Sequence, residues 1–304
     1  MNLPTQIRIR EVGPRDGLQA EHAQVTAEEK AELINRLYAC KLTMIEATSF
    51  VNPRAIPQLA DAEAVIAMVH KPPMATMSAL IGNARGAERA AKAGVDEVMM
   101  VISASEAHNQ RNVNMSIKES MRQMSQTIEF LRTTKLKARA AVATAFGCPL
   151  EGVIPGTRIR AMIKAYNELG VKEITLADTA GLGNPRQVYD LVSMVRDEFP
   201  ANLFALHFHD TRGLGLANSL AGMLGGIEIF ESALGGLGGC PFMPGATGNI
   251  ATEDLVNMSE QMGISTGVDL PGLVAVSSWL KMIVGHELPG RLVSLREQAN
   301  ICSG

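Results

Sequence analysis

The chain has 304 residues, of which 46% are hydrophobic, and its formal net charge is −3. This length and hydrophobic content are ample for a sizeable core. Because α/β barrels of roughly 250 residues fold as one domain, we expect residues 1–304 to form a single catalytic domain. The net charge is weakly negative, and the sequence has no basic run and no basic patch interleaved with aromatic residues. We therefore expect no nucleic-acid partner.

Neither a membrane span nor a disulfide scaffold is predicted. The sequence has no apolar stretch of roughly 18 residues. Its first residues resemble no signal or transit peptide, so we expect a cytoplasmic protein without a membrane partner. The 4 cysteines are too sparse for a disulfide scaffold. Cys40, Cys148, Cys240 and Cys302 show no Cys-x-x-Cys spacing, which argues against a structural zinc site.

Strand-length apolar runs alternate with segments of helical period along most of the chain. The predicted strands are, in chain order, Ile7–Gly13, Met44–Thr48, Ala75–Leu80, Glu97–Ser103, Lys137–Ala143, Lys172–Ala177, Leu203–His209 and Glu228–Leu234. Helices are predicted from about Ala27 and then near Pro57–His70, Asn83–Ala93, Ser116–Thr133, Arg158–Leu169, Pro185–Phe199, Leu214–Leu224, Ala251–Met262 and Pro271–Val284. Thr26 and Glu29 form a capping box that begins the first helix.

Eight successive strand–helix units predict a parallel sheet with helical crossovers. Because eight parallel strands close a barrel, the predicted fold is a (β/α)8 TIM barrel, although an open doubly wound sheet fits the same pattern. Residues 267–304 are expected to form a helical C-terminal extension that caps the barrel or makes an oligomer contact. Arg8 and Arg10 interrupt the apolar pattern of the first strand, so either the lower barrel interior is polar or these arginines reach the bottom rim.

The strongest chemical signal is His207-Phe208-His209, which ends the seventh predicted strand. Residues i and i+2 of a strand point to the same face, so both imidazoles converge at the C-terminal mouth of the barrel, where active sites of this fold lie. This geometry suits a divalent metal. The alternative is a pair of satisfied polar residues at a strand end.

Charged residues also stand at the first two predicted strands. Asp16 can supply an oxygen ligand beside the imidazoles for Mg²⁺, Mn²⁺ or Zn²⁺, and Arg15 can hold a developing oxyanion. Alternatively, the two residues belong to a Pro-Arg-Asp-Gly turn, and Arg15 is a surface residue. Glu46 is a charge inside an apolar strand and needs a partner, for which Arg15 is the candidate. A structural ion pair and a catalytic support both fit Glu46.

Three further candidates follow the sixth and eighth predicted strands. Asp178 can support the metal site or contact substrate, or it can belong to an Asx-turn before Gly181. The glycine-rich loop 235–249 is a candidate lid that carries Cys240, either as an acid–base thiol or as an incidental small residue. Asn249 precedes a helix, so it is either a helix N-cap or an amide ligand to the metal.

Together these residues resemble the 3-hydroxy-3-methylglutaryl-CoA (HMG-CoA) lyase family of TIM-barrel metallolyases, from about Ile7 to Gly267. The loop that contains Cys240 separates this family from the related acyl-transferring synthases. The stretches that carry the resemblance are EVGPRDGLQ (11–19), IEATSFV (45–51), GCP (147–149), Asp178-Thr179, HFHDT (207–211), GLGGCP (236–241), Gly248-Asn249 and TEDL (252–255).

The resemblance implies a divalent metal, most simply Mg²⁺ or Mn²⁺, and cleavage of HMG-CoA to acetyl-CoA and acetoacetate, as in leucine degradation. It also implies an acyl-CoA as the partner and a homodimer as the assembly. The positions that match the family's metal ligands are Asp16, His207, His209 and Asn249. The positions that match its enolate-stabilising arginine, its acidic support, its lid thiol and its site-lining residues are Arg15, Glu46, Cys240, and Gln19, Ser49 and Asp178.

This sequence departs from the family pattern at three positions. Ala141 replaces a tyrosine that is familiar in these lyases, and Ala20 and His22 stand where Asn and Lys are familiar. A methyl group in place of a ring enlarges or reshapes the pocket, so the alternative substrate is another branched 3-hydroxyacyl-CoA or a malyl-type thioester. Remoter alternatives are a metal-dependent hydrolase, because His-x-His in a barrel also occurs in amidohydrolases, and a non-catalytic barrel.

Overall fold

Eight parallel strands form a closed barrel in the computed structural model, which describes residues 3–239 and 248–295. The strands are β1 Arg8–Glu11, β2 Met44–Ser49, β3 Thr76–Leu80, β4 Glu97–Ser103, β5 Lys137–Ala143, β6 Glu173–Asp178, β7 Leu203–Phe208 and β8 Ile229–Ser232. The barrel is closed between β1 and β8, in a register that runs from Arg8 opposite Ile229 to Glu11 opposite Ser232. The predicted TIM barrel is therefore confirmed, and the open-sheet alternative is wrong.

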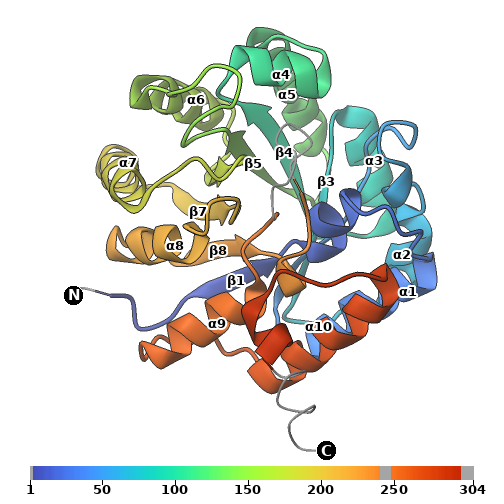
Figure 1. Ribbon diagram of the computed structural model, residues 1–304. Coiled ribbons are helices and arrows are strands. Elements are labelled where there is room, and N and C mark those ends of the chain that lie inside the picture. The colour runs from blue at the N-terminus through green and yellow to red at the C-terminus, as the bar shows by residue number, and fades with distance from the viewer. Residues whose placement is uncertain (1–2, 240–247, 296–304) are drawn as a thin grey trace, which may run out of the picture.

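Helices surround the strands as an outer layer (Figure 1). They are α1 Ala27–Ala39, α2 Ala62–Met68, α3 Ala84–Ala93, α4 Glu106–Val113, α5 Ile117–Leu131, α6 Gly156–Glu168, α7 Pro185–Glu198, α8 Gly215–Leu224, α9 Thr252–Gln261 and α10 Leu270–Val284. Three shorter turns of helix are η1 Gly13–Gly17, η2 Pro57–Leu59 and η3 Leu234–Gly236. Within the described part of the chain, the structure contains no helix of the length and apolar character that a bilayer crossing requires.

Local signals explain where the helices begin. The capping box of Thr26 and Glu29 at the start of α1 is confirmed, and Ser116 and Glu119 form a second one at α5. The helix predicted over 57–70 is divided into η2 and α2. Helix α4 was not predicted from the sequence, because its residues EAHNQRNV lack an apolar stripe. Its start is set by Ser105, whose side chain accepts a hydrogen bond from the backbone N–H of His108.

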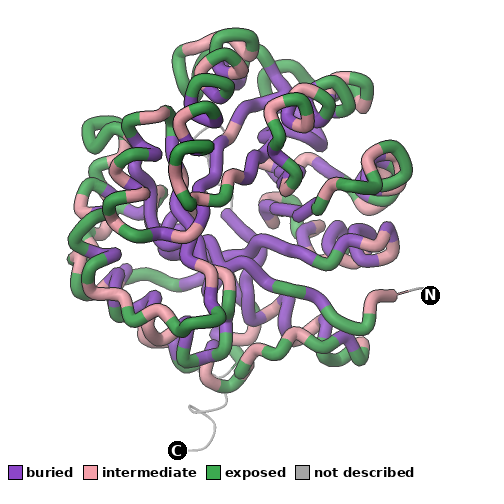
Figure 2. Tube along the Cα trace, turned by 180° about the vertical axis from the view of Figure 1, so that it is seen from behind, coloured by how far each residue is buried: buried purple, intermediate pink, exposed green. Residues whose placement is uncertain are grey.

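The two arginines of β1 lie in different surroundings: the predicted polar interior is confirmed for Arg10, whereas Arg8 lies outside it. Arg10 is 1% exposed. Its guanidinium contacts Glu173 at 2.5 Å, Glu231 at 3.4 Å and Glu97 at 3.5 Å. Arg8, in contrast, is exposed. Figure 2 shows the buried strands gathered inside the exposed outer turns of the helices. Charged side chains from four strands thus fill a space that apolar layers occupy in many barrels.

The helices after β8 cover one side of the barrel and contact the segment that follows this strand. Helix α10 packs against α1, where the guanidinium of Arg36 lies 4.4 Å from the ring centre of Trp279. The carboxylate of Glu253 on α9 accepts hydrogen bonds from the backbone N–H of Gly235, at 2.9 Å, and from the hydroxyl of Ser277 on α10, at 3.0 Å. One buried side chain therefore ties α9, α10 and η3 together.

Glu253 is expected to make stability depend on pH. Burial raises its pKa from 4.5 to about 7. The folded protein therefore binds this proton more tightly than the unfolded chain does. The resulting stabilisation of the folded state is complete below pH 4.5 and is lost as the pH rises through about 7. The shift corresponds to about 3 kcal/mol. In Glu253→Gln, the amide mimics the neutral acid at every pH. Between pH 5 and pH 7.5, the free energy of unfolding measured by urea denaturation should therefore fall less in this variant than in the wild type.

Glu260→Gln is the matched control for this change, because it removes the same charge from an exposed position on α9. It should keep the wild-type dependence on pH. Equal losses of unfolding free energy in the wild type and in Glu253→Gln would contradict the assignment of this dependence to Glu253.

Candidate metal and active site

Three side chains meet at the C-terminal mouth of the barrel in a group that could hold a metal ion. Asp16 comes from η1, His207 from β7, and His209 from the residue after the end of β7. Asp16 Oδ2 lies 3.9 Å from Nε2 of each histidine, and the two ring centres are 5.2 Å apart. One ligand atom from each residue lies within 4.8 Å of the others. The predicted convergence of Asp16 with the paired imidazoles is therefore confirmed.

Electrostatics favour an ionised Asp16 in this group. Burial alone raises the pKa of Asp16, but Arg15, followed by His207 and the hydrogen bond from Asn249, outweighs that effect and holds its pKa at about 2. Burial and the neighbouring His207 lower the pKa of His209 to about 4, so its imidazole is neutral at physiological pH. A negative oxygen beside a neutral imidazole suits the coordination of a divalent cation.

Asn249 completes the group from the other side. It forms an isolated bridge with His209, and its Nδ2 donates to Asp16 Oδ2 at 2.9 Å and to the carbonyl of Leu237 at 3.0 Å. Its Oδ1 is buried and accepts no hydrogen bond from a described residue. The N-cap alternative is wrong, because Ala251 stands at the N-cap of α9. A buried amide oxygen without a donor next to a carboxylate and two imidazoles fits a cation.

Arg15 and Asp16 lie in a single turn of π-helix instead of the reverse turn that was the alternative prediction. Arg15 is 7% exposed, so it is not a surface arginine. Its Nη1 donates to Asp16 Oδ1 at 2.5 Å, and its Nε donates to Glu46 Oε1. The predicted pairing of Glu46 with Arg15 is thus confirmed. Burial alone lowers the pKa of Arg15, but the carboxylates of Glu46 and Asp16 raise it by more than burial lowers it. The guanidinium therefore stays charged.

Gly13 and Glu11 set the position of this turn. Glu11 Oε1 accepts hydrogen bonds from the N–H of Gly13, at 2.7 Å, and from the N–H of Leu234, at 2.8 Å. A Cβ at position 13 would lie 2.6 Å from that oxygen, so only glycine allows the contact. Glu11 Oε2 accepts from the hydroxyl of Thr252 at 2.6 Å. Segments that begin η1, η3 and α9 are therefore joined at one carboxylate.

Two buried charged residues below this site, Arg139 on β5 and Glu231 on β8, were not predicted from the sequence. Glu231 Oε2 lies 3.2 Å from His207 Nδ1, and its Oε1 accepts from Arg139 Nη1 at 2.7 Å. Arg139 Nη2 also donates to Glu46 Oε2. The signal that singled out Glu46, a charge within an apolar strand, was present at both positions and would have found them.

The remaining predicted residues have different surroundings. Ser49 pairs with Leu80 beyond a register shift between Glu46 and Thr48. Leu80 shares a face with Ser78, whose hydroxyl lies 3.4 Å from Arg139 Nη2, so the shift brings Ser49 to the inner face of β2. Gln19 is half-buried, and its Oε1 has no hydrogen-bond partner among described residues.

Asp178 binds backbone N–H groups of the loop after β6, but at residues four and five positions on instead of in the predicted Asx-turn. Its carboxylate accepts from the N–H of Leu182 and from the N–H of Gly183, both at 2.9 Å. Burial raises its pKa. The two hydrogen bonds stabilise the loop between β6 and α7, while the proximity of His207 lowers the pKa of Asp178 and so opposes the effect of burial. Cys240 lies outside the described residues.

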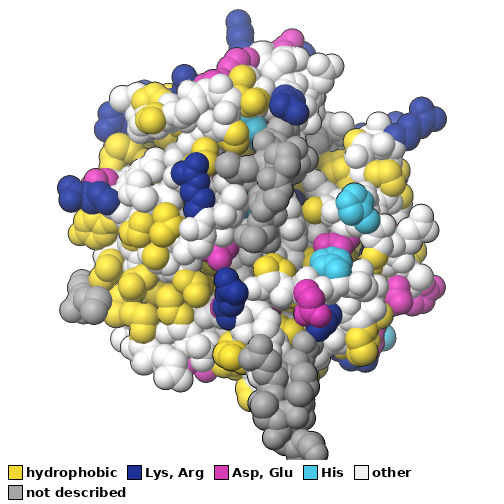
Figure 3. Space-filling view, in the orientation of Figure 1, with side chains coloured by type: hydrophobic (Ala, Val, Ile, Leu, Met, Phe, Trp, Pro, Cys, Tyr) yellow, Lys and Arg dark blue, Asp and Glu magenta, His cyan; other side chains and the backbone are white. Residues whose placement is uncertain are grey.

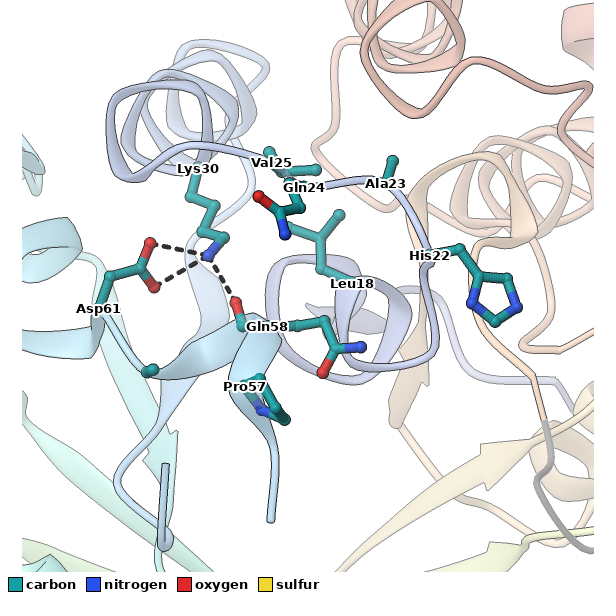
Figure 4. A pocket seen from close by; sticks show the side chains of 10 residues that line it. Leu18, His22, Ala23, Gln24, Val25, Lys30, Pro57, Gln58 and Asp61 are labelled. Carbon is teal, nitrogen blue, oxygen red and sulfur yellow. Dashed lines mark hydrogen bonds and ion pairs between the residues drawn. The ribbon is translucent and has the colours of Figure 1, made fainter. Parts of the chain in front are cut away.

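A separate pocket of about 330 Å³ lies beside the segment that follows η1 (Figure 4). Lys30 is buried in its wall and is neutralised by Asp61, whose two oxygens lie 2.8 Å from Nζ. His22 lies at the far end of the pocket from this pair, on an exposed stretch of chain.

On the face drawn in Figure 3, the Lys and Arg side chains of the described residues are scattered and form no continuous basic patch.

Comparison with known proteins identifies relatives over most of the chain. The profile of the HMGL-like family matches residues 6–280. The hydroxymethylglutaryl-CoA lyase YngG of Bacillus subtilis is 43% identical over 291 residues, which cover 96% of this chain and 97% of that protein. The (R)-citramalyl-CoA lyase of Chloroflexus aurantiacus is 40% identical over 293 residues, 93% of this chain and 92% of that protein.

A solved structure extends the likeness to three dimensions. The structure of an HMG-CoA lyase from Acinetobacter baumannii, in complex with coenzyme A and 3-methylmalate, matches with a TM-score of 0.92 at 44% identity and covers 95% of each chain. Residues 6–280, which the family profile matches, include all those described around Asp16, His207 and Arg15. On these grounds of sequence and fold, the chain belongs to the HMG-CoA lyase family.

Proposed function

We propose that this protein is a carbon–carbon lyase that requires a divalent metal, Mg²⁺ or Mn²⁺, and cleaves HMG-CoA to acetyl-CoA and acetoacetate. The observation that carries the proposal is the meeting of Asp16, His207 and His209 at the barrel mouth, next to the Arg15–Glu46 pair. The names of the relatives support the reaction, and the coenzyme A in the Acinetobacter structure supports an acyl-CoA substrate.

The proposed ligands are Asp16, His207, His209 and the amide oxygen of Asn249. When bound, the metal would supply Lewis acidity that lowers the pKa of the substrate hydroxyl. Asp16 or a water molecule is the candidate base for the hydroxyl proton. The electron pair left on that oxygen forms the ketone as the C2–C3 bond breaks, and the bonding pair passes to C2, which gives the enolate of the acetyl thioester.

Arg15 is proposed to hold the enolate oxygen. Its Nε and Nη1 are engaged by Glu46 and Asp16, whereas no described residue occupies Nη2. A guanidinium that is already fixed by two carboxylates needs little reorganisation when negative charge develops on the substrate. Cys240 is the candidate donor of the proton that converts the enolate to acetyl-CoA, on the strength of the family resemblance.

The proposal is tested by assaying the purified protein with HMG-CoA after treatment with EDTA and after readdition of metal. We expect no cleavage by the EDTA-treated protein and recovery of acetoacetate formation with Mn²⁺ or Mg²⁺. Activity that survives complete metal removal would contradict the metal requirement. Failure to cleave any acyl-CoA, together with no uptake of Mn²⁺ in calorimetry, would favour the non-catalytic barrel.

A different thioester is the second candidate substrate, and Ala141 is the observation that favours it. Ala141 lies two residues after the inward-facing Arg139 on β5, so its methyl group points into the barrel interior. The Chloroflexus relative, named for (R)-citramalyl-CoA, is 40% identical, so family membership alone leaves the acyl group open. The homodimeric assembly that the family resemblance implies also stays a prediction.

Kinetics with a panel of thioesters distinguish the two candidates. The panel contains HMG-CoA, citramalyl-CoA and a 3-hydroxyglutaryl-CoA with a longer alkyl group at C3. We expect the highest kcat/KM with HMG-CoA, and we expect Ala141→Tyr to retain that activity while it loses the longer substrate, because a ring fills space that the methyl group leaves open. Cleavage of another member of the panel without cleavage of HMG-CoA would establish the second candidate.

A further inference from the structure

A continuous line of buried charges connects Arg15 with His207 through the barrel interior. Arg15 bonds Glu46, Glu46 bonds Arg139, Arg139 bonds Glu231, and Glu231 bonds His207. Arg139 stands in the middle of this line and is fully buried. One guanidinium therefore contacts both carboxylates that hold the two halves of the proposed site.

The two oxygens of Glu231 have different neighbours. Three donors face Oε1: Arg139 Nη1 at 2.7 Å, the hydroxyl of Thr175 at 3.0 Å and Arg10 Nη1 at 3.4 Å. Oε2 faces His207 Nδ1 at 3.2 Å. With two guanidinium groups beside it, Glu231 is a carboxylate, and a carboxylate can only accept hydrogen bonds. Nδ1 of His207 must then carry a proton, so in the neutral ring, which is the form that can bind a cation, the lone pair is on Nε2.

That lone pair faces the proposed cation site, because Nε2 of His207 lies 3.9 Å from Asp16 Oδ2. His209 differs: among the described residues, none bonds its Nδ1, so no such neighbour determines its tautomer. A carboxylate behind a ligating imidazole is a common second partner in metal sites, since it fixes both the tautomer and the ring orientation.

We propose that Glu231, held in place by Arg139, is a positioning residue that keeps His207 in the Nδ1–H tautomer and so presents Nε2 to the metal. This inference rests on the proposed function for the metal, but the tautomer itself does not depend on it. Through Glu46, the same Arg139 also orients Arg15, so the oxyanion-binding and metal-binding sides of the site share one support.

Glu231→Gln is the informative variant, because it preserves shape and removes one acceptor. The three donors around Oε1 require the amide oxygen at that position. The amide NH₂ must therefore face His207 Nδ1, which can pair with it only as an acceptor. The imidazole proton then moves to Nε2, and the lone pair no longer faces Asp16.

The tautomer is measured on metal-free protein, at a pH high enough to leave the His207 ring neutral, by ¹⁵N NMR with histidine labelled in the ring, and the His207 signals are identified by their loss in His207→Asn. The wild type should show protonated Nδ1, and Glu231→Gln should show protonated Nε2. Mn²⁺ affinity, measured by calorimetry, should fall by about 10- to 100-fold, the range typical for loss of such a partner. Circular dichroism establishes that the variant is folded.

Glu173→Gln is the matched control. Glu173 lies at the lower end of the same network, where it contacts Arg10, and its described contacts include neither Arg139 nor His207. This variant should keep the wild-type tautomer and Mn²⁺ affinity. An unchanged His207 tautomer in folded Glu231→Gln would overturn the inference, as would an unchanged Mn²⁺ affinity. A wild type that has the Nδ1–H tautomer but binds no Mn²⁺ would instead overturn the proposed function.

Discussion

His207→Ala is expected to abolish the cleavage of HMG-CoA while the protein stays folded. The substitution removes one of the two imidazoles that face Asp16 Oδ2, at 3.9 Å, and leaves a carboxylate, a single imidazole and the amide oxygen of Asn249 for the cation. Loss of the metal's contribution of several kcal/mol to the transition state corresponds to a fall in kcat of at least about 10³-fold. Steady-state kinetics at saturating Mn²⁺, with calorimetry for metal uptake, measure both effects.

His22→Ala is the matched control for this experiment, because His22 is exposed and lies outside the group around Asp16. It should keep wild-type metal uptake. Circular dichroism and thermal unfolding of His207→Ala should resemble those of the wild type, since the alanine leaves Glu231 with its bonds to Arg139 and Thr175. Full activity in His207→Ala would remove His207 from the mechanism, whatever its effect on stability.

Arg139→Met is expected to lower the free energy of unfolding by about 3–5 kcal/mol, which is the usual effect of removing one partner from a buried ion pair. Arg139 is fully buried and contacts Glu46, Glu97 at 3.2 Å and Glu231 at 2.7 Å. Methionine keeps the unbranched apolar stem of the side chain and removes the guanidinium, so all three buried carboxylates lose a cation. Chemical denaturation at pH 7 measures this loss.

Arg132→Met tests whether the effect belongs to burial or to arginine in general. Arg132 pairs with Glu129 at 2.7 Å, but both side chains are well exposed. Removal of such a pair should change stability by less than about 1 kcal/mol. Similar losses in the two variants would show that the interior network does not contribute in the way proposed, and a fully stable Arg139→Met would do so even more directly.

Much of the fold could be predicted because its signals are local. The apolar runs of β4 and β5 have the predicted bounds, and the capping box at Thr26 begins α1 as expected. Helix α4 was missed for the same reason, since its eight residues carry no apolar period. Where a segment's hydrophobic pattern and end signals were both present, the element was found within a few residues.

Some residues of the candidate site could likewise be predicted from a local pattern, and others could not. The alternation of a strand was sufficient to place His207 and His209 on one face, and the structure confirms that Asp16 joins them. Neither the orientation of Ser49 nor the role of Asp178 could be obtained in this way. The first depends on a register shift in β2, and the second depends on hydrogen bonds to the N–H groups of Leu182 and Gly183.

By itself, the sequence determined the number and order of the strands, the closed barrel they favour, and the chemical types that stand at their C-terminal ends. Only the tertiary structure decided that Arg10 and Arg139 lie inside the barrel and that Glu231 stands behind His207. The physical reason is range. A hydrophobic period describes contacts a few residues apart, whereas Glu231 and Arg139 are separated by 92 positions and meet because the strands close into a cylinder.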